Sequence, residues 1–199
     1  MIEVEIKAQI SDPTDIKKKL VENGGMYKIS LLHEDNYFNM PKGLRDFKNT
    51  DEALRVRKSM IFDKNNKKQT QKIEYFITYK GKKLDTITKT RKEIDLRIED
   101  LDKMKEILDI LGFQDVLTVK KERELFELNF ENYQIEVLID YLPILNQYFI
   151  ETEYLSESEA EIQDMREILF AFLTLLGIKK EDSIKESYLE LIINHLGRK

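Results

Sequence analysis

The sequence predicts an α+β fold, in which about eight mostly antiparallel strands are interrupted by two or three helical segments. Two observations lead to this prediction. Short segments that alternate between apolar and charged residues recur up to about residue 154, and such alternation is typical of strands with one buried face. Segments with apolar residues at helical spacing follow the first strand, recur near residue 100, and occupy the C-terminal part of the chain.

The composition limits the class of protein. The 199 residues suit a single domain, with the strands within 1–154 and the C-terminal helices within 155–199. The absence of Cys excludes disulfide scaffolds, thiolate zinc sites and Cys nucleophiles. The net charge of −5 argues against a non-specific nucleic-acid binder, because phosphate contacts need a basic surface. Because no apolar stretch approaches the ~18 residues of a membrane span and no signal peptide is recognisable, we expect a cytoplasmic protein with no membrane partner.

The first half of the chain is predicted to contain strands and one early helix. Val4 and Ile6 alternate with charged residues, which indicates a strand over 2–10. Asp12 is expected to cap a helix over about 14–23 that starts near Pro13 and ends at Gly24. Further strands are expected at 26–38, 53–60, 73–80 and about 85–98, with a loop over 41–50 and a polar hairpin loop over 62–72.

The second half begins with a helix and ends with two. Asp100 is expected to cap a helix over about 101–111, which Gly112 ends. Strands are expected at 116–128, 133–141 and 147–154, followed by amphipathic helices at about 157–176 and 183–196. We expect the last two helices to pack on the core, and a homodimer contact through them is an alternative.

One face of most predicted strands carries long charged side chains, because residues i and i+2 of a strand share a face. The basic residues of this face are Lys7, Arg55, Arg57, Lys80, Lys89, Arg91, Lys121 and Arg123. Its carboxylates are Glu3, Glu5, Glu93, Asp95, Asp140, Glu151 and Glu153. The opposite face is apolar in several strands, for example at Val4 and Val56, and could pack outward against helices.

The simplest interpretation is that the charged face is solvated, as one face of an antiparallel sheet often is. Solvated faces normally mix uncharged polar residues with charged ones, however, and these positions are nearly all charged. If the face turns inward, the sheet must close around water and a ligand, because burying unpaired charge is prohibitive. A polyphosphate with Mg²⁺ or Mn²⁺ fits this set of charged side chains, since basic residues bind phosphate and carboxylates bind hard cations. No P-loop motif is present, so side chains would hold the phosphates.

The segment Glu3-Val-Glu5-Ile-Lys7 resembles the E-x-E-x-K signature of the CYTH, or triphosphate tunnel metalloenzyme, superfamily. Further segments follow the family's order: DNYFNMP at 35–41, TDEALRVR at 50–57, TYKGKK at 78–83, TKTRKEID at 88–95, VKKER at 119–123 and ETE at 151–153. SYLELI at 187–192 is similar to the class IV adenylyl cyclase branch. The resemblance covers residues 1–199 as one domain. It implies an eight-stranded antiparallel closed β-barrel with flanking helices, whose interior tunnel binds a triphosphate and a divalent metal.

The resemblance also implies roles for individual residues. Glu3, Glu5 and Glu153 would be metal ligands, and the further tunnel carboxylates would be Glu93, Asp95, Asp140 and Glu151. These carboxylates would hold Mg²⁺ or Mn²⁺, with two ions expected. The eight basic residues given above would bind phosphate. The expected catalytic set is Glu3, Glu5, Lys7, Arg57, Lys121 and Glu153.

Three functions are consistent with these expectations. The branch resemblance favours a class IV adenylyl cyclase that converts ATP to 3′,5′-cyclic AMP and pyrophosphate. The close alternative is a hydrolase of tripolyphosphate, thiamine triphosphate or a nucleoside triphosphate with the same fold. A non-catalytic sensor of polyphosphate or nucleotide is the third.

Two further expectations concern single residues. His33 is expected to lie on a strand surface without a catalytic role, because neither of the two histidines has metal-ligand spacing. Arg57→Ala is expected to leave the stability of the ligand-free protein nearly unchanged, because it removes a charge from a crowded set of basic groups.

Overall fold

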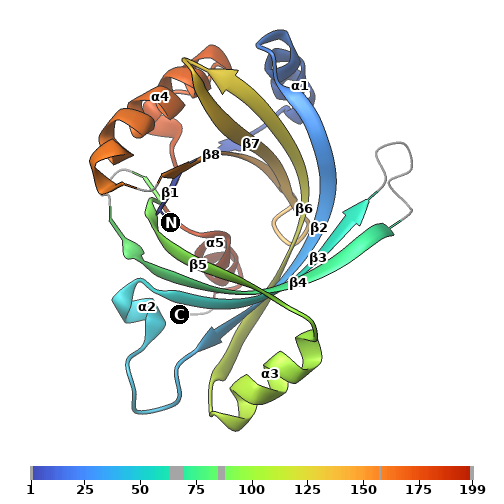
Figure 1. Ribbon diagram of the computed structural model, residues 1–199, viewed down its shortest axis with the longest axis vertical. Helices are drawn as coiled ribbons and strands as arrows, with labels where there is room; N and C mark the ends of the chain where they lie inside the picture. Colours follow the sequence, from blue (N-terminus) through green and yellow to red (C-terminus); the bar gives the residue numbers. More distant parts are fainter. Residues whose placement is uncertain (1, 63–69, 85–87, 157, 198–199) are drawn as a thin grey trace.

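The computed structural model describes residues 2–62, 70–84, 88–156 and 158–197. Figure 1 looks into a closed barrel of antiparallel strands, in the order β1-β5-β4-β3-β2-β6-β7-β8. The strands are β1 Ile2–Ile10, β2 Met26–Asn39, β3 Ala53–Phe62, β4 Thr70–Lys83, β5 Arg91–Ile98, β6 Gln114–Phe130, β7 Tyr133–Leu142 and β8 Gln147–Ser156. The predicted α+β class and the eight-stranded closed barrel are confirmed.

The helices flank this barrel. They are α1 Pro13–Glu22, α2 Phe47–Thr50, α3 Leu101–Ile110, α4 Ile162–Leu175 and α5 Tyr188–His195, with 3₁₀ turns at Glu159–Glu161 and Lys180–Asp182. Both predicted caps form, since the Asp12 carboxylate accepts the amides of Thr14 and Asp15, and the Asp100 carboxylate accepts that of Lys103. Among the described residues, no helix is long and apolar enough to cross a membrane.

Several element boundaries differ from the sequence prediction. The expected loop at 41–50 contains the short helix α2, which Asp46 caps. Strand β5 begins at Arg91 rather than near residue 85, and residues 85–87 lie outside the described ones. Phe62 and residues 70–72 belong to β3 and β4, and the centre of the expected 62–72 loop, 63–69, also lies outside the described residues. Helix α5 begins at Tyr188 rather than at 183, because the preceding segment bonds to β1.

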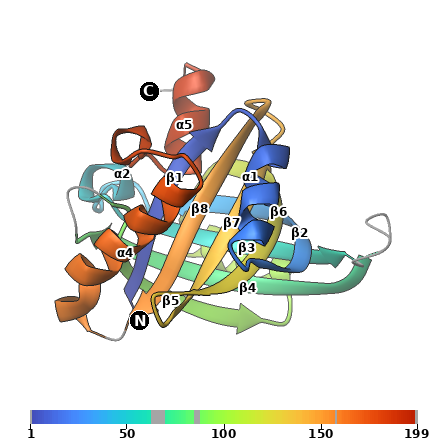
Figure 2. The same cartoon turned by 90° about the horizontal axis from the view of Figure 1, so that it is seen from above.

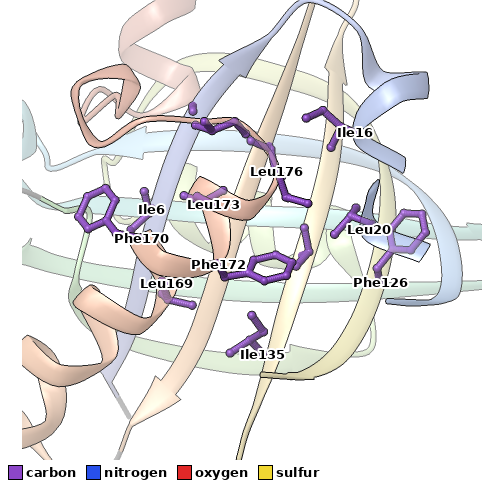
Figure 3. Close-up of a cluster of buried hydrophobic side chains, with 14 of the residues drawn as sticks. Ile6, Ile16, Leu20, Phe126, Ile135, Leu169, Phe170, Phe172, Leu173 and Leu176 are labelled. Carbon is purple, nitrogen blue, oxygen red and sulfur yellow. The ribbon is translucent and has the colours of Figure 1, made fainter. Parts of the chain in front are cut away.

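The main apolar core lies outside the barrel, between its outer face and the helices α1 and α4. Ile6 of β1 and Ile135 of β7 face Leu169 and Leu173 of α4 across this core (Figure 3). Each such side chain contributes roughly 1.5–3 kcal/mol when it is fully buried. A smaller core joins Val56 of β3 to α3. The apolar strand faces therefore point outward, as predicted, and the charged faces point into the barrel.

Helix α5 stands at one end of the barrel, beside the end of β1 (Figure 2). Its residues Tyr188 and Ile192 pack against apolar side chains of the barrel. These side chains are Tyr37, Val119, Leu142 and Phe149. The chain's last described helix thus covers part of the tunnel end.

Candidate active site

The inward faces of the strands form a cavity of about 580 Å³ within the barrel. Seven of the eight predicted phosphate-binding residues line it: Arg55, Arg57, Lys80, Lys89, Arg91, Lys121 and Arg123. Six of the seven predicted carboxylates also line it: Glu3, Glu5, Glu93, Asp95, Glu151 and Glu153. Alternation along separate strands is therefore enough to bring these charges of both signs into one cavity.

Glu3, Glu5 and Glu153 converge at one place on the wall. Strands β1 and β8 pair Glu5 directly with Glu153, and one carboxylate oxygen from each of the three lies within 4.8 Å of the others. Burial and the neighbouring Glu151 raise the pKa of Glu5 to about 8. Burial and Glu3 likewise hold the pKa of Glu153 well above its ordinary value. Three convergent carboxylates, of which Glu5 and Glu153 resist ionising without a nearby cation, suit a hard divalent ion, so the donor set fits Mg²⁺ or Mn²⁺.

Asp140 and Glu151 are held by basic groups instead. Arg123 donates to both oxygens of Asp140, at 2.7 and 2.6 Å, and also to Glu151. Lys89 joins Glu151, at 3.1 Å, to Glu5. Although burial opposes ionisation, Lys89, Lys121 and Arg123 hold the pKa of Glu151 well below its usual range. Both carboxylates therefore anchor the basic residues of the tunnel in the structure, rather than joining the metal-type cluster.

The last two predicted carboxylates have partners on β4. Glu93 accepts from Lys80, and Asp95 accepts from the hydroxyl of Thr78. Both also line a second cavity of about 790 Å³. This cavity shares Glu3 and Glu153 with the first one, so the carboxylate cluster lies where the two meet.

Asp35 is a site residue that the sequence analysis did not select. Its carboxylate accepts two hydrogen bonds from Arg57, at 2.6 and 2.7 Å, and lies 3.6 Å from Arg55. Although burial opposes ionisation, the two guanidinium groups hold the pKa of Asp35 far below its ordinary value. Alternation of His33, Asp35 and Tyr37 along β2 is the signal that could have revealed it. Because Arg57 is paired, the expected neutrality of Arg57→Ala for stability needs revision.

His33 is buried, so its predicted place on a strand surface is wrong. It is 4% exposed, and strand pairing sets it opposite Ser59 and Lys121. Its Nδ1 has no hydrogen-bond partner among the described residues. Burial and the nearby Arg57 hold the pKa of His33 well below its ordinary value, so the imidazole is neutral. The inward parity of β2 places His33 in the barrel.

Lys7 is the one predicted phosphate-binding residue that does not line the cavity. Its ammonium group donates to the backbone carbonyl of Glu186 and lies 4.3 Å from the ring centroid of Tyr188. The side chain is 1% exposed. Burial and the nearby Lys89 lower the pKa of Lys7 to about 7. The chain segment before α5 therefore forms part of the site, which the strand pattern alone does not reveal.

Comparisons with known proteins identify the family of the chain. The model of the CYTH domain matches residues 1–188. The chain belongs to the CYTH domain family.

Individual relatives share both length and fold. A Methanocaldococcus jannaschii protein named "Putative adenylate cyclase" is 40% identical over 196 residues, covering 96% of this chain and 98% of its own. A Pyrococcus horikoshii structure is 37% identical, with a TM-score of 0.82, and covers 97% of this chain and 99% of its own. A Hippeastrum structure, described as a "putative adenylyl cyclase" with a dominant triphosphatase activity, shares the fold at 15% identity, with a TM-score of 0.59. That match covers 100% of this chain and 96% of the Hippeastrum chain.

Proposed function

We propose that this CYTH protein is a metal-dependent enzyme that acts on a triphosphate, with ATP cyclisation to 3′,5′-cyclic AMP as the first candidate reaction. The observation that carries the proposal is the convergence of Glu3, Glu5 and Glu153 beside a cavity lined by seven of the eight predicted phosphate-binding residues. The Lys and Arg side chains can then bind phosphate oxygens, while the carboxylates hold a metal ion that contacts the same triphosphate.

The roles of the residues follow from their positions. Glu3, Glu5 and Glu153 would hold Mg²⁺ or Mn²⁺, which when bound supplies charge neutralisation and activation of a nucleophile. Arg55 and Arg57 would bind phosphate oxygens from one side of the cavity. Lys121, Arg123 and the other lining bases would stabilise negative charge as it moves to the leaving group. Since Asp35, Asp140 and Glu151 orient these cations before the ligand arrives, little reorganisation is needed on binding.

The cyclase and hydrolase reactions differ in which phosphorus meets a nucleophile. In the cyclase reaction, the ribose 3′-hydroxyl attacks the α-phosphorus of ATP and pyrophosphate leaves. In the hydrolase reaction, water attacks the terminal phosphorus and orthophosphate leaves. The name of the Methanocaldococcus jannaschii relative supports the first candidate. The description of the Hippeastrum protein supports a triphosphatase as the second.

Product analysis separates the candidates. We expect the protein to convert ATP to cyclic AMP and pyrophosphate when Mg²⁺ or Mn²⁺ is present, and to lose this activity in a chelator. Products would be resolved by ion-exchange chromatography and ³¹P NMR, with tripolyphosphate and thiamine triphosphate assayed in parallel. Orthophosphate without cyclic AMP would select the hydrolase. Tight binding of a triphosphate without turnover would overturn both enzymatic candidates in favour of a sensor.

A further inference from the structure

The segment that leads into α5 is fixed to the barrel next to Lys7. Ser183 forms a β-bridge with Ala8, and the amide of Ile184 donates to the carbonyl of Lys7 at 2.7 Å. The hydroxyl of Ser187 then accepts a hydrogen bond from the backbone amide of Glu190, and the Glu190 carboxylate accepts one from the backbone amide of Ser187. This reciprocal capping box fixes the start of α5. The first residue of α5, Tyr188, is thereby held at the end of the tunnel.

The ring of Tyr188 is surrounded by ammonium groups from three separate parts of the barrel. The Nζ atoms of Lys7, Lys121 and Lys89 lie 4.3, 5.0 and 5.7 Å from the ring centroid. All three lysines are predicted phosphate ligands, and each is buried. The ring of Phe149 also packs edge to face against the ring of Tyr188, with the two centroids 5.3 Å apart.

When all three lysines are protonated, their like charges repel one another because water is excluded, so neighbouring groups must offset the repulsion. The negative face of an aromatic ring attracts cations within about 6 Å. Carboxylates offset part of the charge of Lys89 and Lys121, through Glu151, Glu5 and Asp140. Lys7 feels the same Glu151 and Glu5 charges, but its direct contacts are the Glu186 carbonyl, the Tyr188 ring and, at 5.9 Å, the Phe149 ring. The Tyr188 hydroxyl is buried without a hydrogen-bond partner among the described residues, so the contact depends on the ring.

We propose that Tyr188 is a positioning residue, whose ring gathers the ammonium groups of Lys7, Lys89 and Lys121 into one cluster that binds a triphosphate. The proposal rests on the proposed function for its ligand. It gives a role to the SYLELI segment at 187–192, which the metal and phosphate assignments leave unused. The C-terminal helix then completes a phosphate site whose other residues come from the barrel.

The first test reads the lysines directly and needs no ligand. The ε-methylene protons of a lysine held over a ring shift upfield in NMR spectra, because of the ring current. We expect this shift for Lys7, which lies nearest the ring, in the wild-type protein and in Tyr188→Phe. Most of the shift should be lost in Tyr188→Leu, where only the more distant Phe149 ring, 5.9 Å from the Lys7 ammonium group, remains. A Lys7 resonance at its ordinary position in the wild-type protein would overturn the proposal.

The second test measures binding of imidotriphosphate with Mg²⁺ by calorimetry, since its bridges resist hydrolysis. Tyr188→Leu should weaken binding by about 10-fold, and Tyr188→Phe should restore wild-type affinity because the ring returns. The matched control is Ile192→Ala, one turn further along α5 in the same apolar cluster. Ile192→Ala should lower the melting temperature but change the affinity by less than about 3-fold.

The outcomes separate this proposal from the proposed function. Wild-type affinity in Tyr188→Leu would overturn the role of the ring while leaving the triphosphate site intact. Equal losses in Tyr188→Leu and Ile192→Ala would show that Tyr188 only packs, and would also overturn the proposal. Equal losses in Tyr188→Phe and Tyr188→Leu would assign the effect to the hydroxyl instead. Failure of the wild-type protein to bind imidotriphosphate, with the Lys7 shift present, would overturn the proposed function.

Discussion

Glu5→Gln is expected to lower metal-dependent turnover of the triphosphate by about 100-fold or more, because it removes a charged oxygen from the proposed metal ligands. The fold should persist. The pKa of Glu5 is raised to about 8, so near neutral pH the metal-free protein already holds this side chain mostly as the neutral acid. The amide has the same shape and charge as that acid. Turnover would be measured against Mn²⁺ concentration, and stability by thermal melting.

The control for this prediction is Glu122→Gln. Glu122 is exposed and points away from the tunnel on β6, so its loss should leave turnover within about 2-fold of wild type. Full activity of Glu5→Gln would contradict the assignment of the metal site. A large fall in melting temperature would instead mean that the Glu5 contact with Lys89 is structural.

Arg57→Ala is expected to destabilise the ligand-free protein by about 3–5 kcal/mol, because it leaves the buried Asp35 carboxylate without its two closest hydrogen bonds. For a chain of this length, that corresponds to a fall of roughly 10 °C in melting temperature. The same variant should also weaken triphosphate binding, since Arg57 lines the cavity. Urea unfolding at neutral pH measures the stability, and calorimetry with imidotriphosphate measures the binding.

A double-variant cycle checks the cause of that loss. In a protein that already carries Asp35→Asn, Arg57→Ala should cost much less, because no unpaired carboxylate remains. An unchanged unfolding free energy in Arg57→Ala alone would restore the earlier expectation, in which crowding among the basic residues offsets the lost ion pair.

Most strands of the barrel could be predicted from the sequence, because the alternation of apolar and charged residues is a local pattern. Most strands show their inward face in their own residues, and apolar outward positions such as Val4 and Val56 reveal which face the helices cover; β6 is charged on both faces near residue 122. The charged inventory of the tunnel follows from the same rule. The convergence of Glu3, Glu5 and Glu153 also depends on the pairing of β1 with β8, the first and last strands, which closes the barrel.

What the sequence did not reveal depends on contacts between distant segments. The bridge from Ser183 to Ala8 fixes where α5 begins, and the segment that follows it contacts Lys7 through the Glu186 carbonyl. The partner of Arg57 lies on a neighbouring strand, so Asp35 reads as one more polar residue until β2 and β3 are paired. The burial of His33 was mispredicted for a related reason. A lone histidine among alternating residues looks exposed unless the inward face of its strand is already known.

The most direct test is a crystal structure with Mn²⁺ and imidotriphosphate, in which anomalous scattering locates the metal. We expect an anomalous peak bounded by the carboxylates of Glu3, Glu5 and Glu153. We also expect the phosphates to lie in the first cavity against Arg55, Arg57 and Arg123. Manganese bound elsewhere with these three carboxylates unoccupied, or a triphosphate bound outside the barrel, would contradict this expectation.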